Sequence, residues 1–288
     1  MKIVGITLPY SHLPFERALQ GLAAAGYRYV GFGLRHEGEY VPPLDAPPEE
    51  WDRVAALCER YGLKPMTIFA RAGVKDAGQT REIEIYRREL DQLARIGIPY
   101  ITGAGVWGYR SFPDVPLTAE EMAERHRAFV QAMQVVGEHA AQRGVTIALK
   151  PHTGDTATAP ILLQTLAEID RPAVKAFYDP GNVRFYEGLD PAEDILAIKG
   201  DMPLLCAKDH RGARAVSDFP VPGEGEVNFP AIFAHLRSIG FDGAITVERI
   251  DGPDNPSELT AEEIDARMRR ARENLIRLAV EAGYPAPE

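Results

Sequence analysis

Short apolar runs alternate with longer amphipathic segments along the whole chain, and most of the longer segments are followed by glycine. The short runs are rich in β-branched and aromatic residues, a composition that predicts strands. The longer segments carry apolar residues at helical spacing and predict helices, after which glycine suits the left-handed position. The predicted strands are residues 3–8, 29–34, 64–70, 100–103, 144–152, 174–178, 204–208 and 243–247. The predicted helices are residues 14–25, 48–61, 80–96, 118–143, 157–169, 191–198, 229–239 and 260–282.

Strands that alternate with helices pair in parallel through crossover connections. Eight such units in a chain of 288 residues match the size of a (β/α)₈ TIM barrel, and no break in composition divides the chain. We therefore expect one domain over residues 1–288. The alternative, an open doubly wound sheet, requires a glycine-rich phosphate loop after the first strand, and residues 6–10 contain no glycine.

Composition narrows the class of protein. The formal net charge of −10 argues against nucleic acid as a partner, because a phosphate backbone requires a basic surface. The two cysteines, Cys58 and Cys206, lie far apart in apolar segments, as in proteins of a reducing compartment. No apolar run reaches the roughly 18 residues of a membrane span, and no signal-peptide pattern precedes the first strand. We expect a cytoplasmic protein with no membrane partner.

Function in a TIM barrel concentrates at the carboxyl ends of the strands. Side chains two residues apart in a strand share a face, so the fifth strand presents Lys150 and His152 together. The same alternation directs Thr246 and Glu248 toward the barrel axis. The other chemically active strand ends are Asp179 on the sixth strand, and Cys206, Lys208 and His210 on the seventh. Buried charges cost several kcal/mol unless they are paired, so we expect a chain that gathers them to use them.

Each of these residues also has a structural interpretation. Asp179 is followed by Pro-Gly and is suited to cap the next turn. Lys150 is suited to neutralise a buried carboxylate, and His152 alone is equally consistent with packing. Asp209 points away from Lys208 in a strand, which favours a hydrogen-bonding role. Trp107 near the barrel rim is suited to stack on a sugar ring, although rim aromatics often serve packing.

The order of the strand-end motifs resembles that of the xylose isomerase-like TIM barrels, the sugar phosphate isomerases and epimerases. The motifs are Asp179-Pro-Gly-Asn182, Ala207-Lys208-Asp209, Pro222-Gly-Glu-Gly-Glu226 with Phe229-Pro-Ala-Ile232, and Thr246-Val-Glu248. The resemblance covers essentially the whole chain and implies a barrel that acts on a sugar or polyol. The family also includes inosose and dehydroshikimate dehydratases and a branch of apurinic endonucleases.

The resemblance further implies a divalent metal ion, Mn²⁺, Mg²⁺ or Zn²⁺, held at the ends of strands five to eight. This chain keeps two of the four usual ligands, Asp179 and Glu248. Lys150 stands where the family has a glutamate, and Cys206 stands where it has a histidine. Asn182 and Gly31 replace two further residues of the pattern. An ammonium group in place of a carboxylate ligand repels a cation, so we do not expect the usual metal site.

Three hypotheses remain for the chemistry. In the first, Lys150 with Lys208 and His152 stabilises an enediolate, and Asp179 or Glu248 is the base. In the second, Lys150 is a Schiff-base nucleophile, which requires a depressed pKa. In the third, a displaced metal ion is bound by the side chains of four residues. These are His152, Asp179, Glu248 and His210.

The sequence thus predicts catalytic and substrate-binding sets of residues. The catalytic set is Lys150, Glu248, Asp179 and His152, and the substrate-binding set is Lys208, His210, Arg211, Asn182 and Trp107. The expected function is a sugar or keto-sugar isomerase or epimerase that transfers a proton next to a carbonyl. The alternatives are a lyase or dehydratase on a related polyol and a non-catalytic sugar-binding barrel. The expected partner is a small sugar or polyol, and a homodimer remains one open possibility for the assembly.

Overall fold

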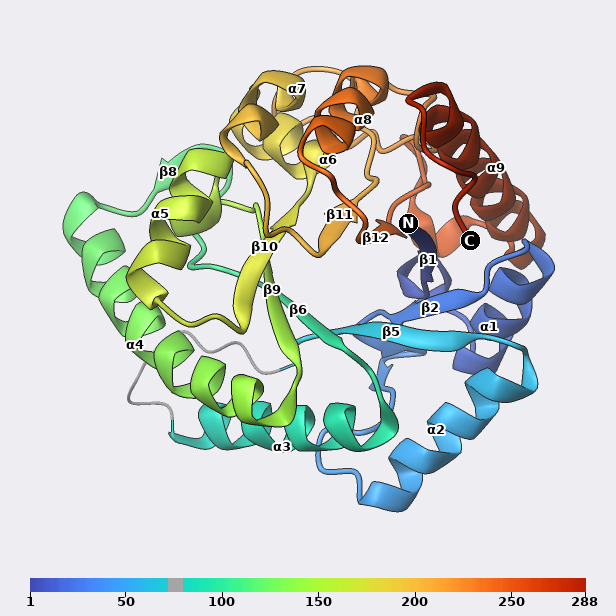
Figure 1. The fold of residues 1–288 in the computed structure, drawn as a ribbon, viewed down its shortest axis with the longest axis horizontal. Helices are drawn as coiled ribbons and strands as arrows, with labels where there is room; N and C mark the ends of the chain where they lie inside the picture. The colour runs from blue at the N-terminus through green and yellow to red at the C-terminus, as the bar shows by residue number, and fades with distance from the viewer. Residues whose placement is uncertain (72–79) are drawn as a thin grey trace.

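Eight parallel strands close into a barrel, and the chain's helices surround it (Figure 1). The computed structural model describes residues 1–71 and 80–288. The barrel strands are β1 (Lys2–Ile6), β2 (Tyr29–Phe32), β5 (Lys64–Phe69), β6 (Tyr100–Ala104), β9 (Thr146–Lys150), β10 (Val174–Tyr178), β11 (Leu204–Cys206) and β12 (Ala244–Val247). Around the barrel the strands run in the order β1, β12, β11, β10, β9, β6, β5, β2. The predicted (β/α)₈ TIM barrel is confirmed.

The helices follow the predicted segments with two differences: the short helix Pro180–Asn182 was not predicted, and the α-helix predicted over residues 191–198 ends at Asp194. They are α1 (Phe15–Ala24), α2 (Pro48–Arg60), α3 (Thr80–Ile96), α4 (Ala119–Arg143), α5 (Ala159–Ile169), α6 (Pro180–Asn182), α7 (Pro191–Asp194), α8 (Phe229–Ser238) and α9 (Ala261–Glu281). Thr118 and Glu121 form a reciprocal capping box at the start of α4, which satisfies two backbone N–H groups that the helix leaves free. Gly144 ends α4 with a φ of 66°, a left-handed conformation that glycine adopts without strain. None of the helices in the described ranges is both long and apolar enough to cross a membrane.

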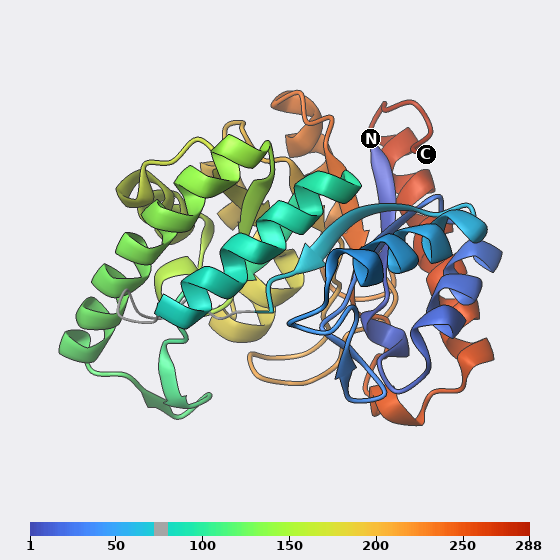
Figure 2. The ribbon, with the colours of Figure 1, turned by 90° about the horizontal axis from the view of Figure 1, so that it is seen from below.

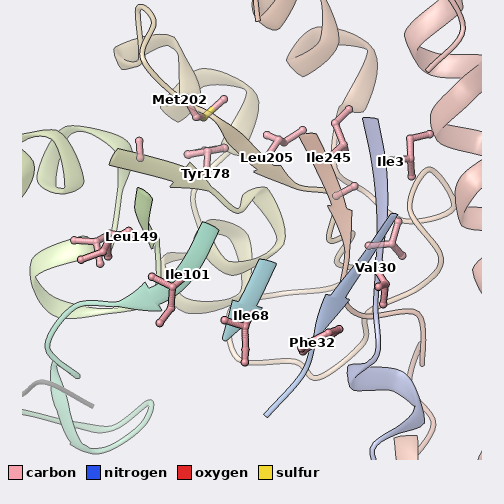
Figure 3. Packing of buried hydrophobic residues seen from close by; sticks show 14 of the residues in the cluster. Ile3, Val30, Phe32, Ile68, Ile101, Leu149, Tyr178, Met202, Leu205 and Ile245 are labelled. Carbon is pink, nitrogen blue, oxygen red and sulfur yellow. The ribbon is translucent and has the colours of Figure 1, made fainter. Parts of the chain in front are cut away.

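The alternation of side chains along the strands separates two apolar layers. One layer fills the barrel and includes Ala148, Cys206 and Ala244. The other lies between strands and helices and takes a residue from each strand, among them Ile3, Ile101, Leu149 and Ile245 (Figure 3). The predicted facing of the fifth and eighth strands is therefore confirmed. Lys150 and Glu248 each follow an inward-facing residue, Ala148 or Thr246, by two positions. The same alternation therefore directs both side chains toward the barrel axis.

The loops that follow the strands depart from the sequence prediction. Two short hairpins, β3 (Arg35–His36) with β4 (Glu39–Tyr40) and β7 (Tyr109–Ser111) with β8 (Val115–Pro116), occupy the loops after β2 and β6. Strands of two or three residues are too short to produce a periodic pattern, which is why the sequence did not reveal them. A single π-helical turn spans Val183–Glu187. Figure 2 shows the long loops at the end of the barrel opposite the chain termini.

The seventh strand is shorter than predicted. It ends at Cys206, although the apolar pattern suggested an end at Lys208. The chain leaves the strand because the Asp209 carboxylate accepts hydrogen bonds from backbone N–H groups of the following loop. The donors are Gly223, Gly225 and Val227. The hydrogen-bonding role predicted for Asp209 is confirmed.

Candidate active site

Four buried charges meet at the carboxyl ends of β9, β10, β11 and β12. The Nζ atom of Lys150 lies 2.5 Å from Glu248 and 3.3 Å from Asp179. The Nζ atom of Lys208 lies 2.6 Å from Glu248 and 2.9 Å from Asp179. Each ammonium thus bridges both carboxylates, and the four groups form a closed arrangement that we call the charge ring. The sequence brought three of its members together as catalytic residues and assigned Lys208 to the substrate.

The surroundings of the charge ring fix its geometry. The Lys150 ammonium lies over the Phe69 and Phe177 rings, 5.5 and 5.7 Å from their centroids, at distances typical of cation–π contacts. Asn182 accepts a hydrogen bond from Lys208 at 2.9 Å and donates one to the Pro151 carbonyl at 2.7 Å. Asn182 therefore joins the loops after β9 and β10 to the ring, and its binding of a substrate stays a prediction.

Mutual pairing favours the charged forms of Lys150, Lys208 and Glu248. Burial lowers the pKa of Lys150, but the neighbouring carboxylates of Glu248 and Asp179 together outweigh burial and raise this pKa above its usual value. The pKa of Lys208 is raised in the same way, because Asp179 and Glu248 outweigh its burial. Burial raises the pKa of Glu248, but Lys150 and Lys208 outweigh burial and hold it well below its usual range. A Schiff-base nucleophile needs a neutral amine, so the raised pKa of Lys150 contradicts the second hypothesis.

An aromatic wall stands beside the ring at the same end of the barrel. Its members are Trp107, Tyr109, Phe112, Phe185 and Tyr186. The His152 ring packs against both Tyr186 and Trp107, with centroids 4.5 and 5.6 Å away. Burial, followed by the charges of Lys150 and Lys208, lowers the pKa of His152 to about 3, so its imidazole is neutral near pH 7. Sequence reasoning found Trp107 and His152 but missed Tyr186, although Phe185-Tyr186 follows the β10 end by only a few residues.

The structure turns two of the predicted substrate-binding residues toward their own loop. The His210 ring lies against Phe185 and Phe219, and its Nε2 atom is 2.7 Å from the Val216 carbonyl oxygen. Arg211 is exposed and donates to the Glu224 carbonyl at 2.7 Å. Both side chains hold the loop after β11, and their binding of a substrate stays a prediction.

The chemistry of the donor groups decides whether a divalent metal ion fits. Among the described residues, the candidate ligand atoms that come together belong to Asp179, Cys206 and Glu248 and lie within 4.8 Å of one another. No histidine belongs to this group, so the described residues do not bring together the four side chains of the third hypothesis, and that site stays an untested prediction. Burial raises the pKa of the Cys206 thiol, which therefore stays protonated and is a poor ligand. The carboxylates of Asp179 and Glu248 are already paired with the ammonium groups of Lys150 and Lys208. These residues therefore do not fit a divalent cation.

A closed parallel barrel with acidic and basic side chains gathered at the carboxyl ends of its strands has the architecture of a TIM-barrel enzyme. A sequence profile described as xylose isomerase-like TIM barrel matches residues 19–271. The chain belongs to this family. The resemblance found in the strand-end motifs is thereby confirmed.

Curated relatives include several enzymes. The chain is 25% identical to the rhizopine catabolism protein MocC of Rhizobium meliloti, over 94% of this chain and 83% of that protein. It is 23% identical to a 2-oxo-tetronate isomerase of Haemophilus influenzae, over 84% of this chain and 90% of that enzyme. An L-ribulose 3-epimerase of Methylomonas sp. is 25% identical, and an inosose dehydratase of Geobacillus kaustophilus is 22% identical. The family is enzymatic, which confirms the expectation of an enzyme of the isomerase, epimerase or lyase type.

Solved structures share the fold at lower identity. A xylose isomerase domain protein from Planctomyces limnophilus superposes with a TM-score of 0.72 at 20% identity, over 97% of each chain. A D-allulose 3-epimerase from Methylomonas sp., solved in complex with D-allulose, superposes with a TM-score of 0.70 at 22% identity, over 96% of each chain. These similarities support the barrel architecture over nearly its full length.

Proposed function

We propose that the chain is a sugar or keto-sugar isomerase or epimerase that transfers a proton on a carbon next to a carbonyl. The observation that carries the proposal is the charge ring, in which two carboxylates alternate with two ammonium groups at the barrel end where the family performs its chemistry. Carboxylates supply a base, and ammonium groups stabilise the oxyanion that forms when the proton leaves. Lys150 takes the place that the family resemblance gives to a metal ligand.

Glu248 is the better candidate for the base. The Asp179 side chain is completely buried, and its Oδ1 atom accepts the N–H of Asn182 at 2.9 Å as the cap of α6. The Glu248 side chain keeps 7% of its surface exposed, and its polar contacts among the described residues are with Lys150, Lys208 and Cys206. Asp179 therefore serves to hold both lysines, and Glu248 is left to exchange a proton with a substrate.

The ring also accounts for the charge that the reaction creates. When Glu248 takes a proton from the carbon, its side chain becomes neutral, and Lys150 and Lys208 each lose one carboxylate partner. The enediolate oxygen of the substrate gains the negative charge at the same moment and becomes the new partner of the ammonium groups. The total charge of the enclosed groups stays unchanged throughout, which avoids the large penalty of an unpaired buried charge.

The substrate class follows from the neighbouring groups. The neutral imidazole of His152 and the aromatic wall offer a polar and an apolar surface beside the ring, as a small polyol requires. The four charges of the ring cancel, so the ring leaves no net positive charge for a phosphate group. We therefore propose an unphosphorylated sugar or polyol, with Trp107 as a stacking surface and Lys208, Asn182 and His152 as polar contacts.

A related lyase reaction begins with the same proton abstraction, so the first test follows the proton. Ketoses, aldoses and inososes are incubated with the protein in D₂O, and deuterium next to the carbonyl is measured by NMR. Exchange with a rearranged sugar as product supports an isomerase or epimerase, and exchange with loss of water identifies a dehydratase. Thermal stabilisation by a sugar without exchange in the whole panel would contradict catalysis and leave a sugar-binding barrel.

A further inference from the structure

The backbone on both sides of Trp107 is tied to the loop that follows β9. The N–H of Val106 donates to Oδ1 of Asp155 at 2.6 Å, and the N–H of Gly108 donates to the Thr153 hydroxyl at 2.8 Å. The N–H of Gly105 donates to the Thr156 hydroxyl at 3.3 Å. The segment that carries Trp107 is therefore held by the same loop that follows Lys150 and contains His152.

Asp155 is the central residue of this connection. It is 5% exposed, and its second oxygen, Oδ2, lies 3.0 Å from Nδ1 of His126 on α4. The opposite ring nitrogen of His126 lies 2.8 Å from Glu168 on α5. These are the two charged groups that face the ring of His126 among the described residues. Although partial burial opposes a charge on His126, the carboxylates of Glu168 and Asp155 raise its pKa and so favour the imidazolium. Burial raises the pKa of Asp155, and the hydrogen bond to His126 acts against that rise.

The contact between the two loops leaves no room for adjustment. A Cβ atom added to Gly105 would lie 1.9 Å from Oδ1 of Asp155 and 2.6 Å from a methyl group of Thr156. Such approaches are far shorter than van der Waals contact, so position 105 needs glycine for the carboxylate to reach the Val106 N–H. The Asp155 side chain thus fixes the backbone one residue before Trp107.

We propose that Asp155, held in turn by His126, is a positioning residue that keeps Trp107 against His152 and Tyr186 at the barrel mouth. If Asp155 served only to connect α4 and α5 through His126, its other carboxylate oxygen would not need to accept the Val106 N–H. The expected effect on substrate binding rests on the proposed function, because it assumes that sugars stack on Trp107. The expected effect on the position of Trp107 does not depend on a substrate.

Fluorescence tests the position of Trp107 directly. The chain has two tryptophans, and Trp51 is buried in the core, so a Trp51→Phe background reports Trp107 alone. If that background fails to fold, the difference between the parent and Trp107→Phe gives the same signal. Asp155→Ala is expected to shift the emission to longer wavelength and to increase quenching by acrylamide. Asp155→Asn keeps an oxygen for Val106 and an N–H₂ group for neutral His126, and is expected to restore the parent emission.

Asp194→Ala is the matched control for a general loss of stability. Asp194 also accepts a backbone N–H, from Ala159 at 2.9 Å, and binds the Tyr178 hydroxyl at 2.9 Å, but it belongs to α7. Its removal is expected to leave the Trp107 emission unchanged. An equal shift in Asp194→Ala, or an unchanged emission in Asp155→Ala, would overturn the proposal, as would an Asn variant that behaves like Ala.

Steady-state kinetics separates positioning from chemistry. Asp155→Ala is expected to raise KM by about tenfold or more while kcat changes little, because a stacking contact acts on the bound substrate and its transition state alike. A loss confined to kcat would overturn the assigned role. If the parent turns over no sugar, the proposed function fails, and the fluorescence comparison still decides whether Asp155 positions Trp107.

Discussion

The Nζ atom of Lys150 lies 2.5 Å from Oε2 of Glu248, although 98 residues separate them in the chain. β9 and β12 are not neighbours in the barrel, since β10 and β11 lie between them. The ion pair therefore joins two strands across the barrel end that share no backbone hydrogen bonds. Neither charge is stable there alone, so each of the two residues determines the protonation state of the other.

Removing one member of the pair is expected to harm stability and activity together, whereas removing both separates the two effects. Lys150→Met leaves two buried carboxylates with one ammonium, a change that costs about 3–5 kcal/mol of the free energy of unfolding. The double variant Lys150→Met/Glu248→Gln keeps Asp179 paired with Lys208 and is expected to regain most of that stability. Urea unfolding measures both values.

Activity is expected to stay lost in Glu248→Gln and in the double variant, by about 10²-fold or more, because the base is absent. Deuterium exchange into the substrate provides the measurement. Full exchange in the stable double variant would show that the ring is only structural, and would remove Glu248 and Lys150 from the catalytic mechanism.

Sequence alone was sufficient for the barrel and for most of the ring because both depend on short-range patterns. Alternation within β12 directs Glu248 inward, and barrel closure brings it to Lys150 without any knowledge of contacts. Lys208 was found as a neighbour of the site but not as a full partner of both carboxylates, since side-chain reach is not encoded by periodicity. The His210 ring could not be placed, because its direction depends on the loop that Asp209 folds, and the contact of Tyr186 with His152 joins two loops without a repeating pattern.

Replacing Lys150 with a carboxylate is expected to create a metal affinity that we do not expect of the parent, because the parent has an ammonium group at that place. Lys150→Glu joins a third carboxylate to Asp179 and Glu248, and such oxygen donors suit Mn²⁺ or Mg²⁺. Millimolar Mn²⁺ is expected to raise the Tm of Lys150→Glu but not that of the parent, and Lys150→Met controls for loss of the ammonium. Calorimetric binding of Mn²⁺ to the parent, with activity lost on chelation, would contradict the role given to Lys150.

The pH dependence of stability follows from the directions of the pKa shifts in the ring. The pKa of Glu248 is lowered from 4.5, so its contribution is complete above about that pH and is lost as the pH falls toward the folded value. The pKa values of Lys150 and Lys208 are raised from 10.5, so their contribution persists up to about that pH and is lost above it. Unfolding measured between pH 3 and 6 is expected to show a steeper acid decline in the parent than in Lys150→Met/Glu248→Gln. Equal slopes would mean that the ring is not ionised as described.

His126 gives a second, opposite pH effect. Because its folded pKa is raised from 6.5, the stabilisation it provides is complete below that pH and is lost as the pH rises through the folded value. The difference in free energy of unfolding between the parent and His126→Gln is therefore expected to shrink from pH 6 to pH 9. Arg53→Gln, which removes an exposed partner of Glu50, serves as a control without such a trend. A constant difference across this range would show that His126 is neutral in the fold.

Asp209 is expected to be the most sensitive residue of the loop after β11. Its two oxygens accept four backbone N–H groups, from His210 at 2.8 Å, Gly223 at 2.9 Å, Gly225 at 2.8 Å and Val227 at 3.0 Å. Asp209→Asn replaces one acceptor oxygen with a donor that opposes two of these groups, so we expect a loss of about 2–4 kcal/mol in urea unfolding.

The matched comparison for Asp209 comes from the other side of the same contact. A Cβ atom on Gly225 would lie 2.3 Å from Oδ1 of Asp209, so Gly225→Ala displaces the carboxylate without changing its charge. Both variants are expected to lose stability, and the double variant is expected to lose less than the sum, because each change disrupts the same set of hydrogen bonds. Strict additivity of the two losses would show that Asp209 and the Gly225 backbone act independently, and the loop would then need another anchor.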